Sequence, residues 1–472
     1  MKSSASHNHD LIILGSGSTA FAAALHAASF GARVLMTEKS ALGGSCINWG
    51  CIPSKTLIHA ALFRHEAALG AAIGVGCLPA GVDAPLLAAH RDRVLQELRQ
   101  ERYLDILKET PGLELVMGVA RFVDRETIEV GGVRYRSERF LLATGGTPRI
   151  PPIPGLEKGN YLTSRGALLL KKIPESLLVV GGGAIAVELG QMFGRLGSRV
   201  TILEYGPRLL PMVEPEPAGA LCRVLRGEGV DVVLNAPVCS VRGEGDGVLL
   251  GALVEGELRE FTGERLLLAV GTAPVTVGIG LELAGVELDR KGFVVVDMHL
   301  RTSAPGIWAA GDVTGGMMIA TVGAREGVLA VEDMFNPGCA CPMDYHTVPM
   351  AIFTDPELGI VGHGEESARL AGLHPMVNVM PVSAIPKSRV TGHRQGVIKM
   401  VAEQGSGRLL GVQLLCHRGT ELINEAALAL KLGATVSDLA NMQPVYPSMG
   451  EGLRLCAQGF SRDITRLSCC AE

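Results

Sequence analysis

Two cysteines five residues apart, Cys46 and Cys51, carry the clearest chemical signal of the sequence, in GGSCINWGCIPSK at residues 43–55. Cysteines at this spacing can close a short-loop disulfide, and the start of a helix favours the thiolate form of a cysteine placed there. Two buried structural cysteines are the alternative. We favour redox chemistry, because the pair directly follows a nucleotide-binding motif.

A second pair, Cys469 and Cys470, stands two residues before the last residue of the sequence. Adjacent cysteines are too close to form an unstrained disulfide easily. On a mobile tail, however, their thiolates can capture a soft, thiophilic metal ion. Composition alone favours the alternative, a frayed tail with incidental cysteines.

The elements that must position these cysteines include a motif that occurs twice: a buried strand, a glycine turn, an alanine-rich helix and a strand ending in an acid. The strands are expected at residues 11–14 and 33–37 in the first copy and at 177–180 and 199–203 in the second. In each copy, the first glycine makes the turn, the second lets the backbone approach a pyrophosphate, the alanine permits close helix packing, and the acid holds a ribose hydroxyl. These residues are Gly15, Gly17, Ala20 and Glu38 in the first copy, and Gly181, Gly183, Ala186 and Glu204 in the second. The repeat predicts two bound dinucleotides; two empty domains of the same type are the alternative.

Further residues that could contact a dinucleotide follow each copy of the motif. Thr144 and Gly145 come after one predicted strand, and Gly271 stands in the equivalent place of the second copy. Residues 306–312 then predict a strand that delivers the carboxylate of Asp312 to a glycine turn, where it can bind a polyol or ribityl hydroxyl. An aspartate cap of the next helix is the alternative.

The pattern changes near residue 341 to separated strands, at 351–354, 396–401 and 409–415, around helices such as 419–432. We therefore predict an α/β protein with two doubly wound dinucleotide-binding domains and a C-terminal α+β domain. The expected boundaries are 1–150 with 276–340 for the first domain, 151–275 for the second and 341–472 for the third.

Composition limits the classes of function. The 472 residues allow about three domains, and 43 basic against 48 acidic side chains leave a net charge of -5 without a basic stretch that would suit nucleic acid. The first ten residues lack an apolar targeting segment, and the longest uncharged stretch, 67–82, is interrupted by glycine and proline, so no membrane span is predicted. Eleven unevenly spaced cysteines indicate specific thiol or metal chemistry in a reducing cytoplasm rather than a secreted disulfide scaffold.

These motifs together resemble the pyridine nucleotide-disulfide oxidoreductases, and the resemblance covers essentially the whole chain. It implies FAD in the first domain, NAD(P) in the second and a homodimer formed through the third. FAD would be held by Gly15, Gly17, Glu38 and Asp312, with Cys51 as the thiolate beside the flavin and Cys46 as the outer thiol. Lys55 and Glu188 look like the family's ion pair beside the flavin ring; an ordinary structural salt bridge is the alternative.

Disulfide-reducing members of the family carry a C-terminal His-Pro-x-x-x-Glu segment, donated across the dimer. Its imidazole, with a pKa near 6.5, shuttles the proton that a thiolate leaving group needs. This chain has Tyr446 at the histidine position and Glu451 at the glutamate position. A phenol with a pKa of about 10 is a poor base at neutral pH, so ordinary disulfide reduction loses its acid-base catalyst.

Tyr446, the ending Ser-Cys-Cys-Ala and Tyr103 all resemble the mercuric reductases of this family; taken alone, Tyr103 would be interpreted as packing on a charged helix. The resemblance implies that Hg(II), held between Cys46 and Cys51, is reduced to Hg(0). Cys469 and Cys470 would take Hg(II) from small thiols and pass it to the other subunit, with Tyr103 and Tyr446 assisting. A thiol-substrate reductase and a metal-sequestering flavoprotein without turnover are the alternatives.

Three features depart from this pattern. Trp49 and Thr272 replace a smaller residue and an arginine, respectively, and no N-terminal metal-binding domain is expected, which leaves delivery to the C-terminal cysteines alone. For the nicotinamide, the carboxylate of Glu204 favours the ribose diol of NADH over the 2'-phosphate of NADPH. Arg208 lies four residues on and could reach a phosphate, so NADPH stays an alternative.

Overall fold

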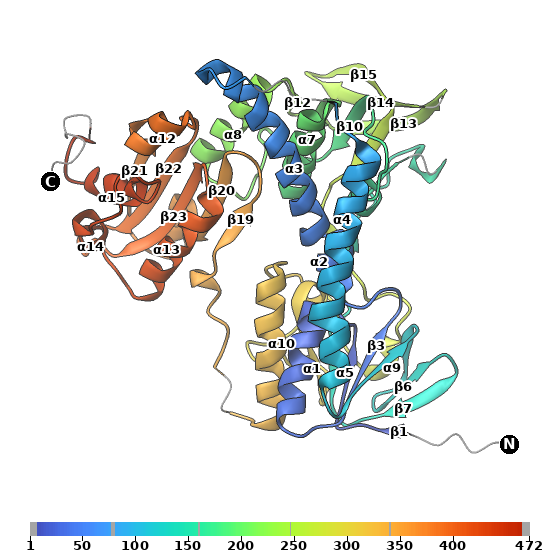
Figure 1. Ribbon diagram of the computed structural model, residues 1–472. Coiled ribbons are helices and arrows are strands. Elements are labelled where there is room, and N and C mark those ends of the chain that lie inside the picture. Colours follow the sequence, from blue (N-terminus) through green and yellow to red (C-terminus); the bar gives the residue numbers. More distant parts are fainter. Residues whose placement is uncertain (1–6, 77–80, 159–160, 246, 339–340, 465–472) are drawn as a thin grey trace. The chain divides into compact units, whose positions relative to one another are not determined.

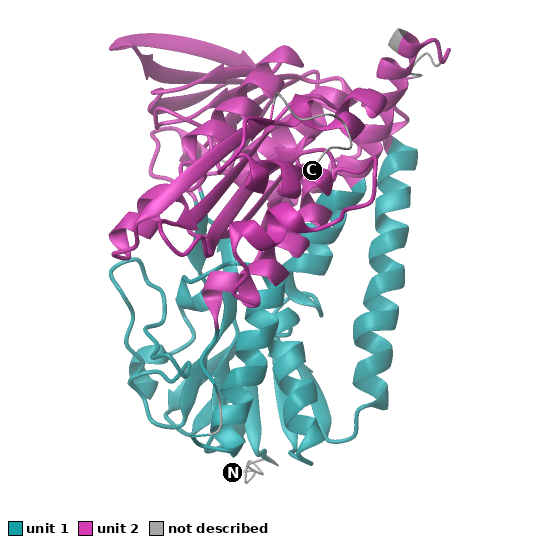
Figure 2. Cartoon of the chain, turned by 90° about the vertical axis from the view of Figure 1, so that its left-hand side faces the viewer, with its two compact units in different colours: residues 1–56, 85–149, 271–343 teal, residues 57–84, 150–270, 344–472 magenta. Residues whose placement is uncertain are grey.

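The computed structural model describes residues 7–76, 81–158, 161–245, 247–338 and 341–464. The chain divides into two compact units, coloured separately in Figure 2. Unit 1 comprises residues 1–56, 85–149 and 271–343, and unit 2 comprises residues 57–84, 150–270 and 344–472. Each unit therefore collects segments that are far apart in the sequence.

Unit 1 is built on a five-stranded parallel sheet (Figure 1). In spatial order its strands are β18 (Ile307–Ala309), β8 (Phe140–Leu142), β2 (Leu11–Leu14), β3 (Val34–Glu38) and β4 (Leu113–Met117). Every residue of β2 and β3 is buried, as expected for central strands covered on both faces. Helices α1 (Ser18–Ser29) and α10 (Ala320–Phe335) lie side by side. A Cβ atom on Gly327 of α10 would lie 2.4 Å from the carbonyl oxygen of Thr19, so glycine is what lets the two helices approach this closely.

The remaining strands of unit 1 form a second sheet and a short ribbon. The second sheet contains β1 (His7–Asn8), β7 (Val133–Arg136), β6 (Thr127–Val130) and β5 (Ala120–Asp124), and the antiparallel ribbon pairs β9 (Gly146–Pro148) with β17 (Thr272–Pro274). The other helices of this part of the sequence are α2 (Gly44–Trp49), α4 (Ala84–Arg99), α5 (Asp105–Glu109), α9 (Leu281–Ala284), the π-helical turn η2 (Gln100–Leu104) and the 3-10 turn η4 (Gly311–Thr314). Helix α3 (Cys51–Gly70) begins in unit 1 and continues into unit 2.

Unit 2 contains a second parallel sheet, in the order β12 (Asp231–Val233), β11 (Arg199–Leu203), β10 (Ser176–Val180) and β16 (Arg265–Leu268). Helices α7 (Ala184–Leu196) and α8 (Pro215–Gly227) follow β10 and β11, and α6 (Ser164–Leu168) precedes β10. An antiparallel sheet is formed by β13 (Val238–Glu244), β14 (Gly247–Val254) and β15 (Glu257–Gly263). The strands and helix of the second predicted nucleotide-binding motif thus lie where the sequence indicates.

The C-terminal part of unit 2 is a five-stranded antiparallel sheet with helices. Its strands are β19 (Met350–Ile352), β20 (Glu357–Gly362), β23 (Leu409–Cys416), β22 (Val397–Glu403) and β21 (Pro375–Pro381). Its helices are α11 (Glu365–Leu370), α12 (Pro386–Thr391), α13 (Gly419–Lys431), α14 (Val436–Asn441) and α15 (Glu451–Gln458). Strand β23 is buried along its whole length. The strand expected at 351–354 instead ends at Ile352, before the turn that contains Pro356.

The predicted fold class is confirmed. Two parallel sheets are each followed by a helix at the glycine turn, α1 and α7, and the C-terminal part is an antiparallel sheet with helices. The exact domain boundaries stay a prediction. None of the helices in the described ranges combines the length and apolar character that a membrane span requires.

Candidate active site

The turn between β2 and α1 is fixed by glycine in unit 1. Gly15 has a φ of +124°, and a Cβ atom on it would lie 2.2 Å from the carbonyl oxygen of Ala143, so no larger residue fits. Gly17 is the N-cap of α1, and among the described residues no side chain caps the amides of that helix's first turn. An uncapped helix N-terminus approached by glycine backbone can hold a pyrophosphate.

Glu38 ends β3 beside this turn and is buried. Its Oε2 atom accepts a hydrogen bond of 2.6 Å from the Ser16 hydroxyl, and its Oε1 atom accepts from the amides of Ser40 and Ala41 at 2.7 and 3.2 Å. The carboxylate is therefore held in one orientation at the carboxyl end of the sheet. Its Oε2 atom, which accepts only one of these bonds, keeps acceptor capacity for a ribose hydroxyl.

The other residues predicted to bind FAD lie at the same carboxyl ends of parallel strands. Thr144 follows β8 and donates its hydroxyl hydrogen bond to the carbonyl of Val275 at 2.7 Å, and Gly145 has a φ of +71°. Asp312 follows β18 in turn η4. Burial, and then the nearby Glu326, raise the pKa of Asp312. These groups fit a dinucleotide laid across the sheet edge, where α/β sheets bind ligands.

The cysteine segment packs directly on the glycine turn. A Cβ atom on Gly44 would lie 2.6 Å from the Cα atom of Gly17, and the Gly43 amide donates to the Ser16 carbonyl at 3.1 Å. Both Gly43 and Gly44 have positive φ angles. Two glycines at this contact thus place helix α2, which carries Cys46, against the predicted FAD motif.

Cys46 and Cys51 belong to different helices rather than to the start of one. Cys46 lies in α2, and Cys51 is the first residue of α3. Gly50 makes the break possible, because a Cβ atom on it would lie 2.9 Å from the Ser45 carbonyl oxygen. The expectation of a helix start therefore applies to Cys51, while Cys46 lies within the preceding short helix.

The two sulfurs are in the thiol form and interact with each other. The side-chain hydrogen bond to Cys51, then burial, raise the pKa of Cys46 well above that of an ordinary cysteine, whereas the positive charge of Lys55 acts in the opposite direction. The assignment of Cys51 as the thiolate of the pair stays a prediction.

Tyr103 lies beside this pair, on the π-helical turn η2. Its ring approaches the Cβ position of Gly43 to 3.3 Å and packs edge-on against Phe21, with the ring centroids 4.9 Å apart. Burial, then the charges of Cys46 and Cys51, raise the pKa of Tyr103, which keeps the phenol protonated. π-Helical turns occur frequently at functional sites.

Two polar residues near the cysteines carry no signal in the sequence. Asn48 is buried and donates to the carbonyls of Leu42 and Gly44 at 2.9 and 2.8 Å. Arg99 of α4 donates to its Oδ1 atom at 2.5 Å. This bond ties α2 to the helix that leads to Tyr103, so both residues support the geometry of the cysteine segment.

The second glycine turn, in unit 2, repeats the geometry of the first. Gly181 has a φ of +111°, and a Cβ atom on it would lie 2.4 Å from the Ala269 carbonyl oxygen. Gly183 is the N-cap of α7, and no described atom outside its own neighbours lies within 4 Å of its Cβ position. Gly183 therefore leaves open space at the start of the helix, as an approaching pyrophosphate requires.

Glu204 lies over this second turn. Its Oε2 atom is 2.7 Å from the Cβ position of Gly182, and its Oε1 atom accepts a 2.7 Å hydrogen bond from the Gly206 amide. Arg208 instead donates to the Pro211 carbonyl at 2.9 Å. Gly271, with a φ of +106°, accepts a hydrogen bond from the Arg149 amide in unit 1, and its predicted contact with the nicotinamide stays a prediction.

Glu188, on α7, is buried and accepts a 2.8 Å hydrogen bond from the Phe353 amide. Lys55 lies on the first turn of α3 in unit 1. Their predicted ion pair joins residues of the two units and stays a prediction. Within unit 2, Glu188 thus fixes the segment that follows β19.

Tyr446 lies in the turn before α15, and Glu451 is the first residue of that helix, in unit 2. The Tyr446 side chain is 49% exposed, while Glu451 is buried and accepts a 3.2 Å hydrogen bond from the Ser448 amide. Burial raises the pKa of Glu451. Cys469 and Cys470 lie outside the described residues.

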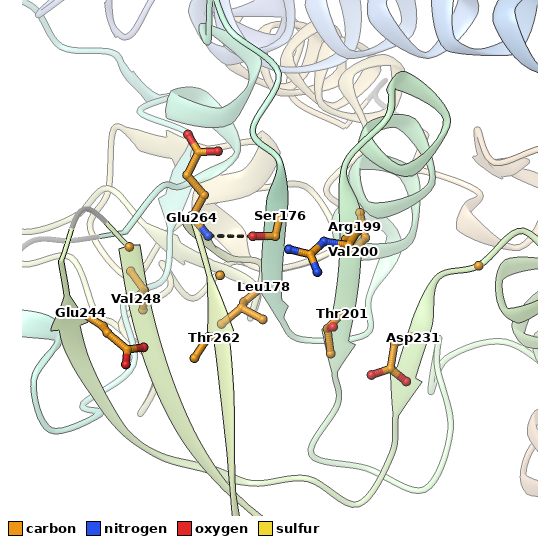
Figure 3. A pocket seen from close by; sticks show the side chains of 13 residues that line it. Ser176, Leu178, Arg199, Val200, Thr201, Asp231, Glu244, Val248, Thr262 and Glu264 are labelled. Carbon is orange, nitrogen blue, oxygen red and sulfur yellow. Dashed lines mark hydrogen bonds between the residues drawn. The ribbon is translucent and has the colours of Figure 1, made fainter.

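A pocket of about 490 Å³ in unit 2 lies away from the predicted nucleotide site. It is lined by Ser176, Arg199 and Asp231, the first residues of β10, β11 and β12 (Figure 3). The glycine turn follows the opposite, carboxyl end of β10. Because dinucleotides bind at the carboxyl ends of parallel strands, we assign no cofactor to this pocket.

Comparisons with known proteins agree with this geometry. The family described as pyridine nucleotide-disulphide oxidoreductase matches residues 9–327, and its dimerisation domain matches residues 348–457. The mercuric reductase of Bacillus cereus is 37% identical over 98% of this chain and 73% of its own. The dihydrolipoyl dehydrogenase of Thermus scotoductus is 38% identical over 96% of this chain and 98% of its own. The Cu(II) complex of the HOCl-induced flavoprotein disulfide reductase RclA from Escherichia coli superposes with a TM-score of 0.86 at 32% identity, over 96% of this chain and 99% of that one.

The glycines of the second turn allow a matched test of dinucleotide binding. We expect Gly181→Ala to lower the free energy of unfolding by about 1–3 kcal/mol, because of its positive φ and the Ala269 carbonyl. Gly183→Ala has room in the protein and should change stability by less than about 0.5 kcal/mol, yet raise the KM for the nicotinamide about tenfold or more by blocking the pyrophosphate. Thermal unfolding and steady-state kinetics measure the two effects. An unchanged KM in folded Gly183→Ala would exclude the predicted pyrophosphate contact.

Proposed function

Because the chain belongs to the pyridine nucleotide-disulphide oxidoreductase family, we propose that it reduces Hg(II) to Hg(0) with electrons from NAD(P)H, through FAD and the Cys46–Cys51 pair. The observation that carries this proposal is a pair of interacting thiols on the first nucleotide-binding turn. Tyr446, at the position where disulfide-reducing members have histidine, directs the proposal towards a substrate that needs no proton from that position. The relatives named mercuric reductase, such as the one from Bacillus cereus, support it.

FAD would be held at Gly15, Gly17, Glu38 and Asp312 and, when bound, would supply a two-electron relay between the hydride donor and the sulfurs. Glu38 and Asp312 would orient the cofactor by accepting hydrogen bonds from its hydroxyl groups. The fit rests on the uncapped start of α1 and on the fixed Glu38 carboxylate. The nicotinamide would bind the second turn, at Gly183 and Glu204.

The cysteine pair would bind the substrate by exchanging its protons for the metal. Thiolates are the ligands of a soft ion, so Hg(II) displaces the remaining proton from Cys46 and joins the thiolate of Cys51. The overall reaction is NAD(P)H + Hg(II) → NAD(P)⁺ + H⁺ + Hg(0), in which the hydride supplies both electrons. Hg(0) has little affinity for thiolates and leaves.

Reduction of Hg(II) requires less acid-base catalysis than disulfide reduction does. Cleaving a disulfide releases a thiolate that must be protonated, for which a histidine is suited. Reduction of a thiolate-bound metal ion releases an atom that needs no proton. Tyr103, kept protonated beside the cysteines, and Tyr446, half exposed in the turn before α15, would assist in handling the ion.

The dimerisation domain indicates a homodimer, and we propose that the active sites are shared between its subunits. Cys469 and Cys470 would take Hg(II) from small thiols and transfer it to Cys46 and Cys51 of the partner subunit. A cytoplasmic location would provide both the reduced nicotinamide and the small thiols that this delivery needs.

NAD(P)H-dependent reduction of a disulfide, as in lipoamide dehydrogenase, is the second candidate function. The 38% identity with the dihydrolipoyl dehydrogenase of Thermus scotoductus favours it, as does the Cys46–Cys51 pair itself. The absence of a histidine at position 446 is the argument against it. Oxidation of nicotinamide by the purified protein with Hg(II) in excess thiol, compared with oxidised lipoamide and oxidised glutathione, distinguishes the two functions. Faster turnover of either disulfide than of Hg(II) would favour the second.

The roles of the two inner cysteines can be tested separately. We expect Cys51→Ser to abolish the thiolate-to-flavin charge-transfer absorbance of the two-electron-reduced enzyme, because we propose Cys51 as the thiolate beside the flavin. Either Cys46→Ser or Cys51→Ser should lower Hg(II) reduction by about 10³-fold or more, since each removes a ligand of the metal. Absorbance during reductive titration and mercury volatilisation are the measurements. Retained turnover in the double variant would overturn the mechanism.

Cofactor preference follows from Glu204. A carboxylate fixed over the turn accepts hydrogen bonds from a ribose diol but repels a 2'-phosphate, and Arg208 is bonded to the Pro211 carbonyl. We therefore expect NADH to be used at least as well as NADPH, as measured by kcat/KM for each. Glu204→Gln should shift the ratio towards NADPH. A large preference of the unaltered enzyme for NADPH would contradict this role of Glu204.

The C-terminal cysteines are expected to matter only when Hg(II) arrives bound to thiols. Transfer between thiolates proceeds by exchange, one ligand entering as another leaves. Changing Cys469 and Cys470 to Ala should therefore leave reduction of the inner pair by NADH intact but sharply lower turnover of Hg(II) in excess small thiol. A weakly ligated Hg(II) halide can reach the inner pair directly and should be much less affected.

Subunit sharing is tested by mixing this tail variant with an inactive Cys46→Ala variant. Heterodimers then contain one complete site if the tail and the inner pair come from different chains, so thiol-buffered activity should recover. No recovery after verified subunit exchange would show that each tail serves its own subunit. An unimpaired tail variant would make both cysteines incidental.

A further inference from the structure

Three potential metal ligands meet in unit 2, in a part of the chain that the proposed reaction does not use. Asp355, His393 and His417 each offer one ligand atom, and these atoms all lie within 4.8 Å of one another. Asp355 lies between β19 and β20, His393 precedes β22, and His417 follows β23. The antiparallel register brings the three together, because Glu357 pairs with Cys416 and Val397 pairs with Leu415 at this end of the sheet.

The two histidine rings lie face to face. Their centroids are 3.9 Å apart and their planes differ by 10°. Two imidazolium ions would repel each other at this separation, so the arrangement favours neutral rings with an available lone pair.

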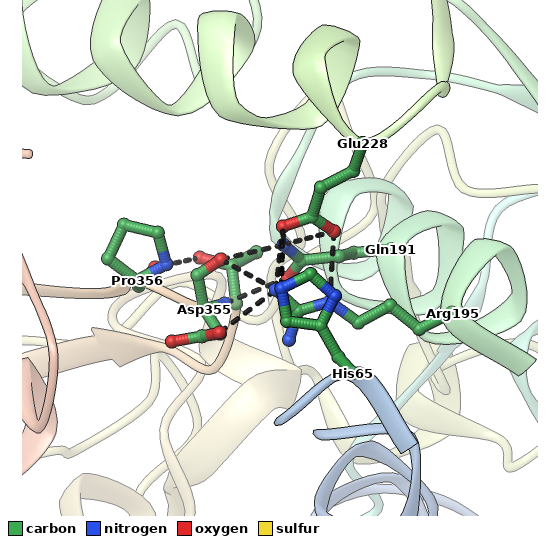
Figure 4. A network of polar contacts seen from close by, with 7 residues as sticks. His65, Gln191, Arg195, Glu228, Asp355 and Pro356 are labelled. Carbon is green, nitrogen blue, oxygen red and sulfur yellow. Dashed lines mark hydrogen bonds and ion pairs between the residues drawn. The ribbon is translucent and has the colours of Figure 1, made fainter. Parts of the chain in front are cut away.

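The carboxylate of Asp355 is oriented by a network of charges (Figure 4). Arg195 Nη2 donates to its Oδ2 atom at 2.9 Å, and the Arg195 guanidinium also donates to both carboxylate oxygens of Glu228, at 2.9 and 2.6 Å. Arg418 and Glu66 also act on His417, so three carboxylates and two guanidinium groups leave a net charge of -1 around the histidines. That excess negative charge suits a divalent cation. Arg195 binds the Oδ2 atom of Asp355, so the Oδ1 atom can serve as the metal ligand.

The backbone of Asp355 is fixed as well. Its amide donates to Gln191 Oε1 at 2.8 Å, and its carbonyl accepts from Gln191 Nε2 at 2.7 Å. Figure 4 shows Gln191 and Arg195, both from α7, reaching the same aspartate. Partners that orient a ligand in this way are typical of metal sites, where they are as much part of the design as the ligands.

We propose that Asp355, His393 and His417 bind a divalent transition-metal ion of the zinc class. Two imidazoles and a carboxylate are ligands that Zn²⁺ accepts, with a fourth position for water. Bonds of about 2.0–2.1 Å place tetrahedral ligand atoms about 3.3 Å apart, so the rings must turn out of their stack as the metal enters. The donor set distinguishes this site from the thiolates of the proposed reaction, which prefer a softer ion.

Occupation of the site would stabilise the segment between β19 and β20, which is hydrogen-bonded to α7. Phe353, two residues before Asp355, donates its amide hydrogen bond to Glu188 on the same helix. A ligand that binds only the folded state raises the free energy of unfolding by RT ln(1 + L/Kd), where L is the free ligand concentration. Thermal stability therefore reports binding without relying on turnover.

The experiment uses the full-length, FAD-loaded protein with Cys46, Cys51, Cys469 and Cys470 changed to Ser, so that the proposed mercury ligands cannot bind zinc. After treatment with EDTA, this parent is titrated with Zn²⁺ by calorimetry. We expect one site, and a higher melting temperature at saturating Zn²⁺. His393→Gln and His417→Gln should each weaken Zn²⁺ binding by about 100-fold or more, since loss of a mere supporting partner already costs about 10–100-fold.

The matched control is the other histidine pair of unit 2, His346 and His363, whose ring centroids are 4.4 Å apart. The variant of the parent in which both of these control histidines are changed to Gln should bind Zn²⁺ as tightly as the parent does. Co²⁺ in the parent should give visible ligand-field bands without the near-ultraviolet charge transfer of thiolate ligands, a result that does not depend on the folding of the histidine variants. No Zn²⁺ site in the parent, thiolate charge transfer with Co²⁺, or equal binding by parent and histidine variants would overturn the proposal.

Discussion

The close approach of Gly17 to Gly44 is the constraint on which the candidate active site depends. A side chain at position 44 would meet the Cα atom of Gly17 at 2.6 Å, so glycine is required at position 44, where the cysteine segment crosses the first nucleotide-binding turn. The same turn supplies the uncapped start of α1. Cofactor binding and sulfur placement are therefore not independent: a change that displaces the turn displaces Cys46 with it.

A second constraint, in unit 2, is the charge balance around α7. That helix contributes Glu188, Gln191 and Arg195, which bind the amides, carbonyl and carboxylate of the segment after β19. Buried charges cost free energy unless they are paired and hydrogen-bonded. Here Arg195 is paired with Glu228 and Asp355, and its pKa is raised by these partners against the opposing effect of burial. The network therefore fixes a loop that has no regular structure of its own.

The sequence predicts the parts of this protein that depend on local patterns. The strand-turn-helix motifs at Gly15 and Gly181 are local, because positive φ and close helix packing require particular residues within a short window, and both are found as expected. The break at Gly50 and the π-helical turn at Tyr103 were not predicted, since they depend on packing rather than on period. Pairs such as Asn48 with Arg99 join residues 51 positions apart, which a single sequence does not reveal.

The same distinction explains why the chain can hold two kinds of metal-binding chemistry apart. Cys46 and Cys51 are close in sequence, so their pairing is a local property, and their thiolates suit a soft ion in two-coordinate geometry. Asp355, His393 and His417 meet only through the register of an antiparallel sheet, and their nitrogen and oxygen atoms suit a harder ion with more ligands. We therefore expect Hg(II) to prefer the proposed thiolate site over the imidazole-carboxylate cluster. Exchange of Hg(II) for zinc at the thiols would cost the strong bonds to sulfur, while the imidazole-carboxylate cluster offers Hg(II) no sulfur at all.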